Sequence, residues 1–177
     1  IFIADLVGIG MTRELGPLIT AIILTGRSGS AFAAEIGTMK ISDEIDALTI
    51  MGIKPLHYLV LPRILAVMIV MPFLTLFSDF FGIFGGMVIS LAALDLTFTA
   101  FMNQLQQAIG LWDVFSGVLK GFVFGILVAG TGCYRGLETE GGALSVGRST
   151  TSSVVSGIFL IVLADSTFAI LFHYLGL

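Results

Sequence analysis

Four long apolar stretches separated by short polar segments set the pattern of this chain. They cover Ile1 to about Ile36, Leu56 to about Leu94, Val114 to about Tyr134, and Ser149–Leu177. Each stretch approaches or exceeds the roughly 20 apolar residues that a helix needs to cross a bilayer. The pattern therefore predicts an all-α integral membrane protein with four transmembrane helices in this sequence.

Within the first stretch, Pro17 is expected to bend or restart the helix, because proline lacks the backbone N–H of a helix interior. Small residues follow it at three- and four-residue spacing. They are Gly26, Ser30, Ala33, Ala34 and Gly37. In a bilayer such a stripe lets a second helix approach closely. We interpret it as a surface for helix packing, either within the chain or between two copies in a dimer. The alternative interpretation is that these residues line the path of a substrate.

The segment Thr38–Pro55 predicts a short amphipathic helix that connects the first two spans. Ser42 is the expected N-cap, and Gly52 and Pro55 are expected to end the helix. The apolar side consists of Ile41, Ile45 and Leu48. The acidic side consists of Asp43, Glu44 and Asp46. This acidic side is either an ordinary solvated face or a docking surface for a cytoplasmic partner.

Two further polar segments separate the remaining spans. Asp95–Asp113 contains no Lys or Arg and includes Trp112, which suits a membrane interface, whereas Arg135–Arg148 is rich in glycine. Basic residues flank this second segment and the amphipathic helix. They are Lys40, Lys54, Arg63, Arg135 and Arg148. By the positive-inside rule, the amphipathic helix and the Gly-rich connection are predicted to be cytoplasmic and the 95–113 segment external.

Composition excludes a soluble globular protein. Of 177 residues, 56% are hydrophobic and only 11% are charged, against about 25% charged residues in a soluble domain. The net charge of −4 gives no argument for nucleic-acid binding. Cys133 is the single cysteine, so neither an intrachain disulfide nor a cysteine metal cluster is expected. His57 and His173 are interpreted as interface residues, and no metal site is predicted.

Charged residues inside the apolar stretches are the candidate functional residues. Asp79, Lys120 and Asp165 each lie about 15 to 17 residues from the cytoplasmic end of a span, which is roughly 23–26 Å of helix. Together with Arg13 and Glu14 they are expected to share one layer in the outer half of the membrane. A charge at this depth costs at least about 2.5–3.5 kcal/mol. Either the charges neutralise one another, or they line a cavity where Arg13 and Lys120 meet an anionic head group.

The sequence contains no Gly-rich loop that ends in Gly-Lys-Ser/Thr, so no nucleotide-binding P-loop is expected. No catalytic residue and no cofactor are predicted, and if ATP drives this protein, another chain binds it. The sequence begins at Ile1 without a basic segment or a cleavage site. We therefore expect it to be a piece of a longer protein.

The segment from Arg13 to Arg63, RELGPLITAIILTGRSGSAFAAEIGTMKISDEIDALTIMGIKPLHYLVLPR, resembles the signature region of MlaE-type permeases. These are the membrane subunits of ABC transporters that work with MCE-domain proteins in lipid trafficking. Further similarity follows at 79–86 (DFFGIFGG), around Lys120, at 133–136, at 146–157 (VGRSTTSSVVSG) and around Asp165. The resemblance covers essentially all of residues 1–177 as one permease domain. It implies that an N-terminal interfacial helix and a first membrane helix are missing here, which gives five spans in the full-length chain.

The resemblance also implies partners, a substrate and site residues. The expected assembly is a homodimer in the bacterial inner membrane, and its expected substrate is phospholipid. Its expected partners are cytoplasmic ABC ATPases, an external MCE-domain protein and, in many systems, a STAS-domain protein. The ATPase would dock on a coupling helix at about Ile41–Met51. Its expected contact residues are Ile41, Asp43, Glu44, Ile45, Asp46, Leu48 and Met51. The expected cavity residues are Arg13, Glu14, Leu15, Lys120, Asp165 and Asp79.

Two other functions are compatible with the same residues. Asp79, Lys120 and Asp165 are also suited to a relay in an ion or proton channel or carrier. A membrane scaffold that only anchors partners is the third possibility, and it predicts that these charges can be neutralised without loss of function.

Overall fold

The computed structural model describes residues 2–93 and 97–175, which form helices joined by short turns. Four helices are long and apolar enough to cross a membrane. They are Ile3–Ile41, Leu56–Ala93, Leu111–Leu137 and Ala143–Leu175. The predicted all-α class and the four spans of this sequence are therefore confirmed. The parts of our predictions that concern residues 1, 94–96 and 176–177 lie outside the described residues.

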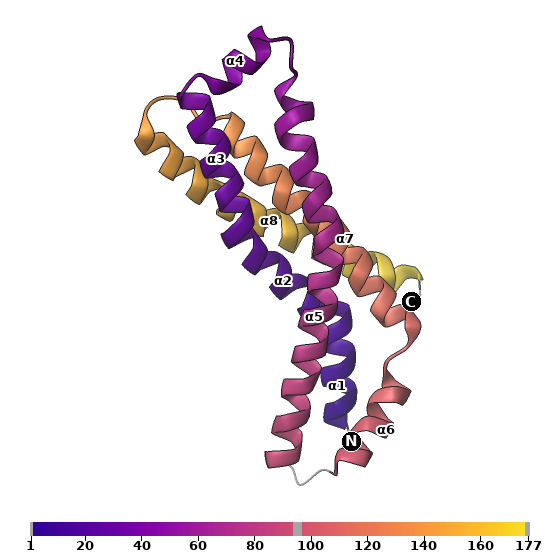
Figure 1. The fold of residues 1–177 in the computed structure, drawn as a ribbon. Coiled ribbons are helices and arrows are strands. Elements are labelled where there is room, and N and C mark those ends of the chain that lie inside the picture. The colour runs from indigo at the N-terminus through magenta and orange to yellow at the C-terminus, as the bar shows by residue number, and fades with distance from the viewer. Residues whose placement is uncertain (1, 94–96, 176–177) are drawn as a thin grey trace.

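The first span alternates between α-helical and π-helical turns. Its five parts are α1 (Phe2–Gly10), η1 (Met11–Leu15), α2 (Gly16–Leu24), η2 (Thr25–Gly29) and α3 (Ser30–Ile41). Figure 1 shows that these parts follow one another as one helix, which bends between α1 and α3. Pro17 lies in the first turn of α2, directly after η1, as expected of a helix that restarts at proline. The span continues to Ile41, beyond the predicted end at Ile36.

The connecting helix is shorter than predicted. Residues 38–41 belong to α3, and α4 covers only Glu44–Ile50. Ser42 is not the N-cap, which corrects our prediction: its hydroxyl donates to the Thr38 carbonyl at 2.9 Å and thus completes the end of α3. Asp43 precedes α4 with φ of 60° and makes no side-chain cap hydrogen bond. This left-handed residue turns the chain from the first span into α4.

The C-terminal end of α4 is the predicted one. Gly52 has φ of 79°, a conformation that glycine adopts without a Cβ clash. Its N–H donates to the Thr49 carbonyl at 3.0 Å, and the Ile53 N–H donates to the Leu48 carbonyl at 3.0 Å. These two bonds form a Schellman motif. Pro55 follows, and the π-helical turn η3 (Leu56–Val60) then leads into α5 (Leu61–Ala93).

The last two helices start earlier than the hydropathy pattern indicated, and one more helix lies in the polar interlude before them. The polar interlude contains α6 (Phe98–Ala108), and α7 covers Leu111–Leu137. The Gly-rich connection was predicted over Arg135–Arg148, which is wrong in extent, because only residues 138–142 separate α7 from α8 (Ala143–Leu175). Gly141, with φ of 102°, makes this turn. A hydroxyl hydrogen bond from Ser145 to the Gly142 carbonyl, at 2.6 Å, then starts α8.

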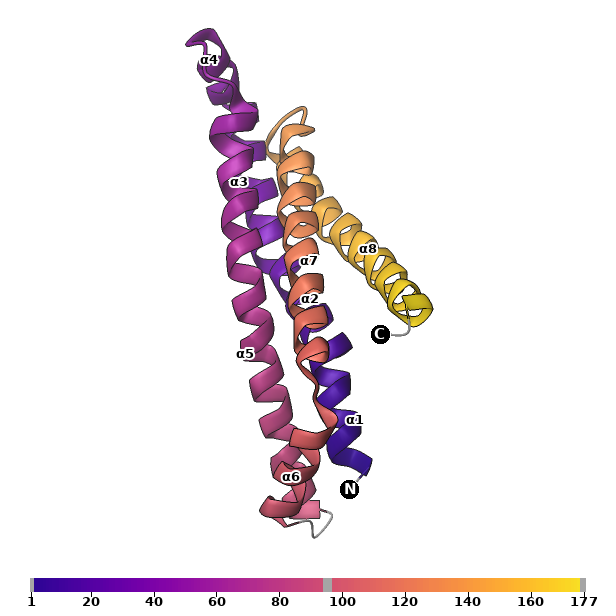
Figure 2. The same cartoon turned by 90° about the vertical axis from the view of Figure 1, so that its right-hand side faces the viewer.

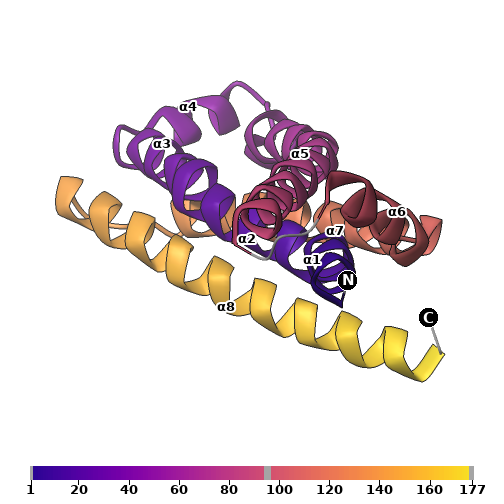
Figure 3. The same cartoon turned by 90° about the horizontal axis from the view of Figure 1, so that it is seen from below.

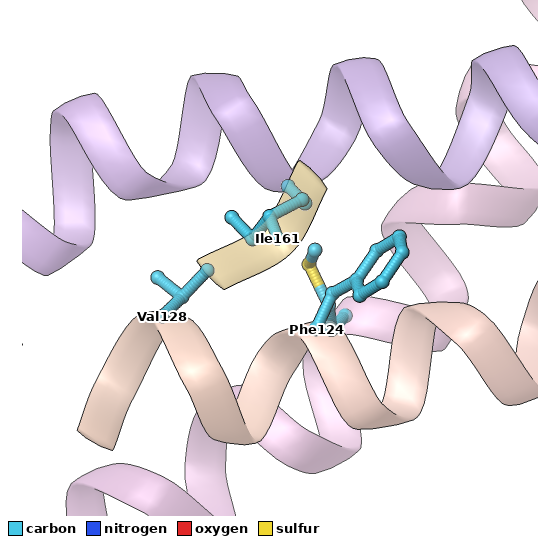
Figure 4. Close-up of a cluster of buried hydrophobic side chains, with 5 residues drawn as sticks. Phe124, Val128 and Ile161 are labelled. Carbon is cyan, nitrogen blue, oxygen red and sulfur yellow. The ribbon is translucent and has the colours of Figure 1, made fainter. Parts of the chain in front are cut away.

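Helix α7 occupies the centre of the bundle and packs against α3, α5 and α8. Figure 1 shows α4 at one end of the bundle and α6 at the other, beside the start of α1. Figures 2 and 3 show that α8 lies along one side and diverges from α7 toward its C-terminus. Between the helices lies a fully buried apolar cluster of Ala21, Met71, Phe124, Val128 and Ile161 (Figure 4). Four separate helices contribute to it, so it fixes their mutual positions.

Glycines on α7 allow these close approaches. A Cβ on Gly132 would lie 2.5 Å from the Gly29 carbonyl oxygen, and one on Gly136 would lie 2.7 Å from Cβ of Ile36. The glycines that face neighbouring helices are Gly117, Gly121, Gly125, Gly132 and Gly136. They recur every four residues within two groups, which is the spacing of close helix packing in membranes. The sequence pattern did not reveal this role.

We predict that Gly132→Ala lowers the unfolding free energy by about 1–3 kcal/mol, as expected for an added methyl group in a filled contact. The new Cβ would meet the backbone of Gly29, which cannot move aside as a side chain can. Thermal unfolding in detergent measures the effect. Gly130→Ala is the matched control, because no atom lies within 4 Å of a Cβ at Gly130. Equal unfolding temperatures for the two variants would contradict the close contact.

Candidate functional site

A buried ammonium group joins three of the spans. Lys120 on α7 is fully buried, and its Nζ lies 2.5 Å from Oε2 of Glu14 and 3.0 Å from Oδ1 of Asp165. Glu14 belongs to η1 and Asp165 to α8. The sequence left open which acid pairs with Lys120, and the structure assigns this role to Glu14 and Asp165. Two carboxylates compensate the loss of water around the ammonium group.

The local backbone explains how these groups meet. Gly117 lies one turn before Lys120 on α7, and a Cβ at this position would overlap the Thr12 carbonyl. The absence of a side chain at Gly117 therefore lets α7 touch the first span. Glu14 lies two residues beyond Thr12, within reach of Lys120. The close contact of two backbones thus positions the ion pair.

Arg13 has a partner that the sequence analysis missed. Its Nη1 lies 3.3 Å from Oδ1 of Asp113, and both side chains are partly buried. Oδ2 of the same Asp113 accepts the Gly110 N–H at 2.8 Å and so caps the start of α7. The sequence pattern places Asp113 at the end of the external polar segment. Its position three residues after a glycine, where an apolar run begins, is a capping signal that would have indicated this role.

Asp79 lies apart from the Lys120 ion pairs. Its side chain on α5 is 5% exposed, and its Oδ1 has no hydrogen-bond partner among the described residues. It packs against Gly16, where a Cβ would overlap the carboxyl group. Because Gly16 follows Glu14 by two residues, Asp79 lies near Glu14 along the first span. It does not take part in the Glu14–Lys120 ion pair.

A cavity of about 420 Å³ adjoins the ion pairs. It lies between the start of the first span and the end of α8. Its lining residues are Ile9, Gly10, Arg13, Glu14, Ala169, Phe172 and His173. Charged groups occupy one part of this lining and apolar side chains the rest, so the cavity suits an amphiphilic molecule. Lys120 and Asp165 lie behind Glu14, outside the lining.

Not every predicted cavity residue reaches this cavity. Leu15 is 47% exposed, and neither Leu15 nor Asp79 belongs to the lining. His173, which we had interpreted as an interface residue, does belong to it. A lone histidine near the end of an apolar span carries no sequence signal that distinguishes these two roles.

Helix α4 presents two different surfaces. Ile45 is buried with Ile36, Leu59, Val60 and Cys133, and Leu48 packs against this cluster. The acidic residues are exposed, namely Asp43, Glu44 and Asp46. Ile41 is half-buried, and Met51 at the end of the helix is 66% exposed. The helix is therefore anchored to the bundle on one side and open on the other.

The stripe of small residues is divided within this chain. Ala33 and Gly37 are buried, and Gly37 contacts Thr139 beyond the end of α7. Gly26 is exposed, and the hydroxyl of the partly exposed Ser30 donates to the Gly26 carbonyl at 2.6 Å. The wider π-helical turn η2 changes the helical register between Gly26 and Ala33, which the sequence pattern did not reveal.

Among the described residues, no group of three or more His, Cys, Asp or Glu side chains is placed to hold a metal ion.

Comparison with known proteins gives one family. The sequence model described as "Permease MlaE" matches residues 1–171. A probable ABC transporter permease protein of Synechocystis sp. is 44% identical over 163 residues, which are 92% of this chain and 62% of that protein. A probable ABC transporter permease protein of Rickettsia typhi is 41% identical, with 92% and 63% covered. Protein TRIGALACTOSYLDIACYLGLYCEROL 1, chloroplastic, of Arabidopsis thaliana is 39% identical, with 92% and 47% covered. The chain thus spans less than two thirds of each of these relatives.

We predict that Lys120→Met lowers the unfolding free energy by about 3–5 kcal/mol, because it leaves two facing carboxylates without their cation. Adding Glu14→Gln and Asp165→Asn to this variant should recover most of the loss. Unfolding in detergent measures both steps. Lys54→Met, the same change at an exposed position outside the spans, should have little effect. A Lys120→Met variant as stable as this control would refute the structural role of the pair.

Proposed function

This chain belongs to the MlaE permease family, and we propose that it is the membrane-spanning part of an ABC transporter that moves phospholipid. The observation that carries the proposal is the cavity beside Arg13 and Glu14, whose lining is partly charged and partly apolar. The match over residues 1–171 supports the permease role. The name of the Arabidopsis relative contains that of a glycerolipid, which supports a lipid as the cargo.

The cavity suits the two chemically different parts of a phospholipid. The guanidinium of Arg13 attracts a phosphate. Asp113 fixes the position of this guanidinium, because its Oδ1 lies 3.3 Å from Nη1 of Arg13. Acyl chains pack against apolar side chains such as Ile9, Ala169 and Phe172. The Lys120 ion pairs support the wall behind Glu14. In this proposal, the chain binds and moves lipid without forming or breaking a covalent bond.

The energy comes from a separate ATPase that docks on α4. The acidic residues of α4 face away from the bundle, while Ile45 on its other side packs against both α3 and η3. A push on α4 is therefore transmitted to the first two spans together. Packed helices transmit such a push as rigid bodies. Narrowing of the cavity at the other end of the first span would then displace the lipid.

The wider assembly is a proposal of the same kind. We place α4 at the cytoplasmic side and α6 at the external side of a bacterial inner membrane, following the distribution of basic residues. A second copy of the chain would complete the cavity, an MCE-domain protein would receive lipid on the external side, and a STAS-domain protein would bind the ATPase. Exposed apolar side chains along α5 and α8 provide surface for lipid and for a second copy.

The ion-relay alternative has less support. It requires Asp79, Lys120 and Asp165 to exchange protons, yet among the described residues Asp79 shares no hydrogen bond with the other two.

We predict that Asp43→Lys, Glu44→Lys and Asp46→Lys together prevent the ATPase from binding, because they reverse the charge of the exposed side of α4. The dimer should stay intact. Co-purification of the ATPase and the size of the complex measure the two effects. Glu140→Lys reverses one exposed charge in the α7–α8 connection and is the control. Unchanged recovery of the ATPase with the triple variant would refute docking on the acidic side.

We also predict that the full-length protein, isolated gently from its native membrane, carries an ATPase, an MCE-domain protein and bound phospholipid. Mass spectrometry identifies all three. The triple α4 variant should lose the ATPase and keep the lipid. An isolated oligomer without an ATPase would instead favour the scaffold or the ion carrier.

A further inference from the structure

His173 lies on the α8 side of the cavity, whereas the charged residues of the lining lie on the first span. It belongs to the last turn of α8 and is exposed. Arg13 and Glu14, both in η1, line the same cavity of about 420 Å³. The cavity therefore brings together a guanidinium, a carboxylate and an imidazole from the two ends of the sequence.

Two consecutive residues of α7 hold the two sides of this cavity. The ring of Trp112 contacts the ring of Phe172, the residue before His173, with 6.3 Å between the ring centroids. Phe172 is buried. The next residue of α7, Asp113, binds Arg13 with 3.3 Å between Oδ1 and Nη1. The start of α7 therefore ties the end of α8 and the first span to each other beside the cavity.

The ion pairs beside the cavity carry one net negative charge, because they contain two cations and three carboxylates. Their members are Arg13, Lys120, Glu14, Asp113 and Asp165. A phosphodiester brings one more negative charge, which Arg13 attracts but which the cluster as a whole disfavours. A protonated imidazole at His173 balances the charge of the cluster. It also offers N–H donors on the side of the cavity away from Arg13.

Two structural roles of His173 compete with a role in binding. A cation in the last turn of a helix is stabilised by the helix dipole, and the imidazole lies 6.3 Å from the ring of the neighbouring Tyr174. Neither role requires the residue to line a cavity together with Arg13 and Glu14. Both roles predict effects on folding stability that do not depend on a phospholipid.

We propose that His173 donates a hydrogen bond to the phosphate of the bound phospholipid, and that protonation of the imidazole strengthens this contact. Arg13 binds the same phosphate from the first span, so the head group bridges the two sides of the cavity. A hydrogen bond from a charged donor is stronger than one from a neutral donor. This inference rests on the proposed phospholipid transport and adds a residue that makes head-group binding depend on pH.

Histidine changes its charge between about pH 5 and 8, so the acidity on the external side sets how firmly the lipid is held. Other titratable groups lie on the elements around the imidazole. They are Asp5, Arg13 and Glu14 on the first span, Asp113 and Lys120 on α7, and Asp165 and Tyr174 on α8. All of them remain in a His173 variant, so such a variant isolates the contribution of the imidazole.

Titration calorimetry of the full-length protein with its ATPase, in a nonionic detergent, tests the inference. The probe is a phosphatidylglycerol with short acyl chains, added at about pH 6 and at about pH 8, within the range in which histidine titrates. The unaltered protein should bind it roughly tenfold more tightly at the lower pH, the difference between a neutral and a charge-assisted hydrogen bond. His173→Gln should bind it equally at both pH values, as weakly as the unaltered protein does at the higher pH.

Two further variants and a second probe serve as controls. His57→Gln removes the other histidine of the sequence, which is exposed at the α4 end, and should keep the full pH dependence. His173→Lys, which stays charged over this range, should bind at both pH values as tightly as the unaltered protein does at the lower pH. A short-chain diacylglycerol, which lacks the phosphate, should bind without pH dependence.

Three results would overturn the inference. They are equal binding of the phosphatidylglycerol by the unaltered protein at both pH values, a pH dependence that persists in His173→Gln, and loss of the pH dependence in millimolar inorganic phosphate, which would assign the contact to a free anion. In each case phospholipid binding, and with it the proposed transport, still stands. No binding of the phospholipid at either pH would refute both. A His173-dependent contact in a preparation that binds no ATPase would refute the ABC transporter and leave the contact standing.

Discussion

The buried ammonium of Lys120 is the interaction on which the arrangement of the spans depends. An unpaired charge in this position would be more costly than most helix contacts can offset. Its contacts with Glu14 and Asp165 therefore require the first span, α7 and α8 to stay together at one level. Figure 2 shows α8 diverging from α7 toward its C-terminus. The ion pair thus ties the first span and α7 to this less closely packed helix, beside the cavity.

Packing at the other end of the bundle has a different chemical basis. Ile45 joins α4 to α3, η3 and α7 through an apolar cluster. Apolar contacts tolerate small sliding movements better than ion pairs, which demand fixed distances. The bundle therefore combines a charged, geometrically strict region near the cavity with a more adaptable region beside α4. Such a division suits a protein in which force enters at one end and acts at the other.

The sequence predicted what depends on average hydropathy and on local capping. The four spans, the exposed acidic side of α4 and its Gly52 terminus are examples. It did not predict features that depend on a second helix. Asp113 pairs with Arg13 across 100 residues, and Gly117 matters only because Thr12 lies against it. The π-helical turns and the short α7–α8 connection were also missed, since each reflects packing of whole helices more than the preference of single residues.

The two π-helical turns of the first span have a consequence for how this helix responds to a deletion. A π turn holds about one residue more than an α turn, so the helix accommodates this extra residue without shifting the turns on either side. Deleting one residue there would convert the π turn into an α turn and leave the turns beyond it facing their present neighbours. Glu14 and Arg27 lie inside these two turns. The directions of both charges therefore depend on these wider turns, and a helix without the extra residue would keep its flanking contacts while other side chains pointed outward within each turn.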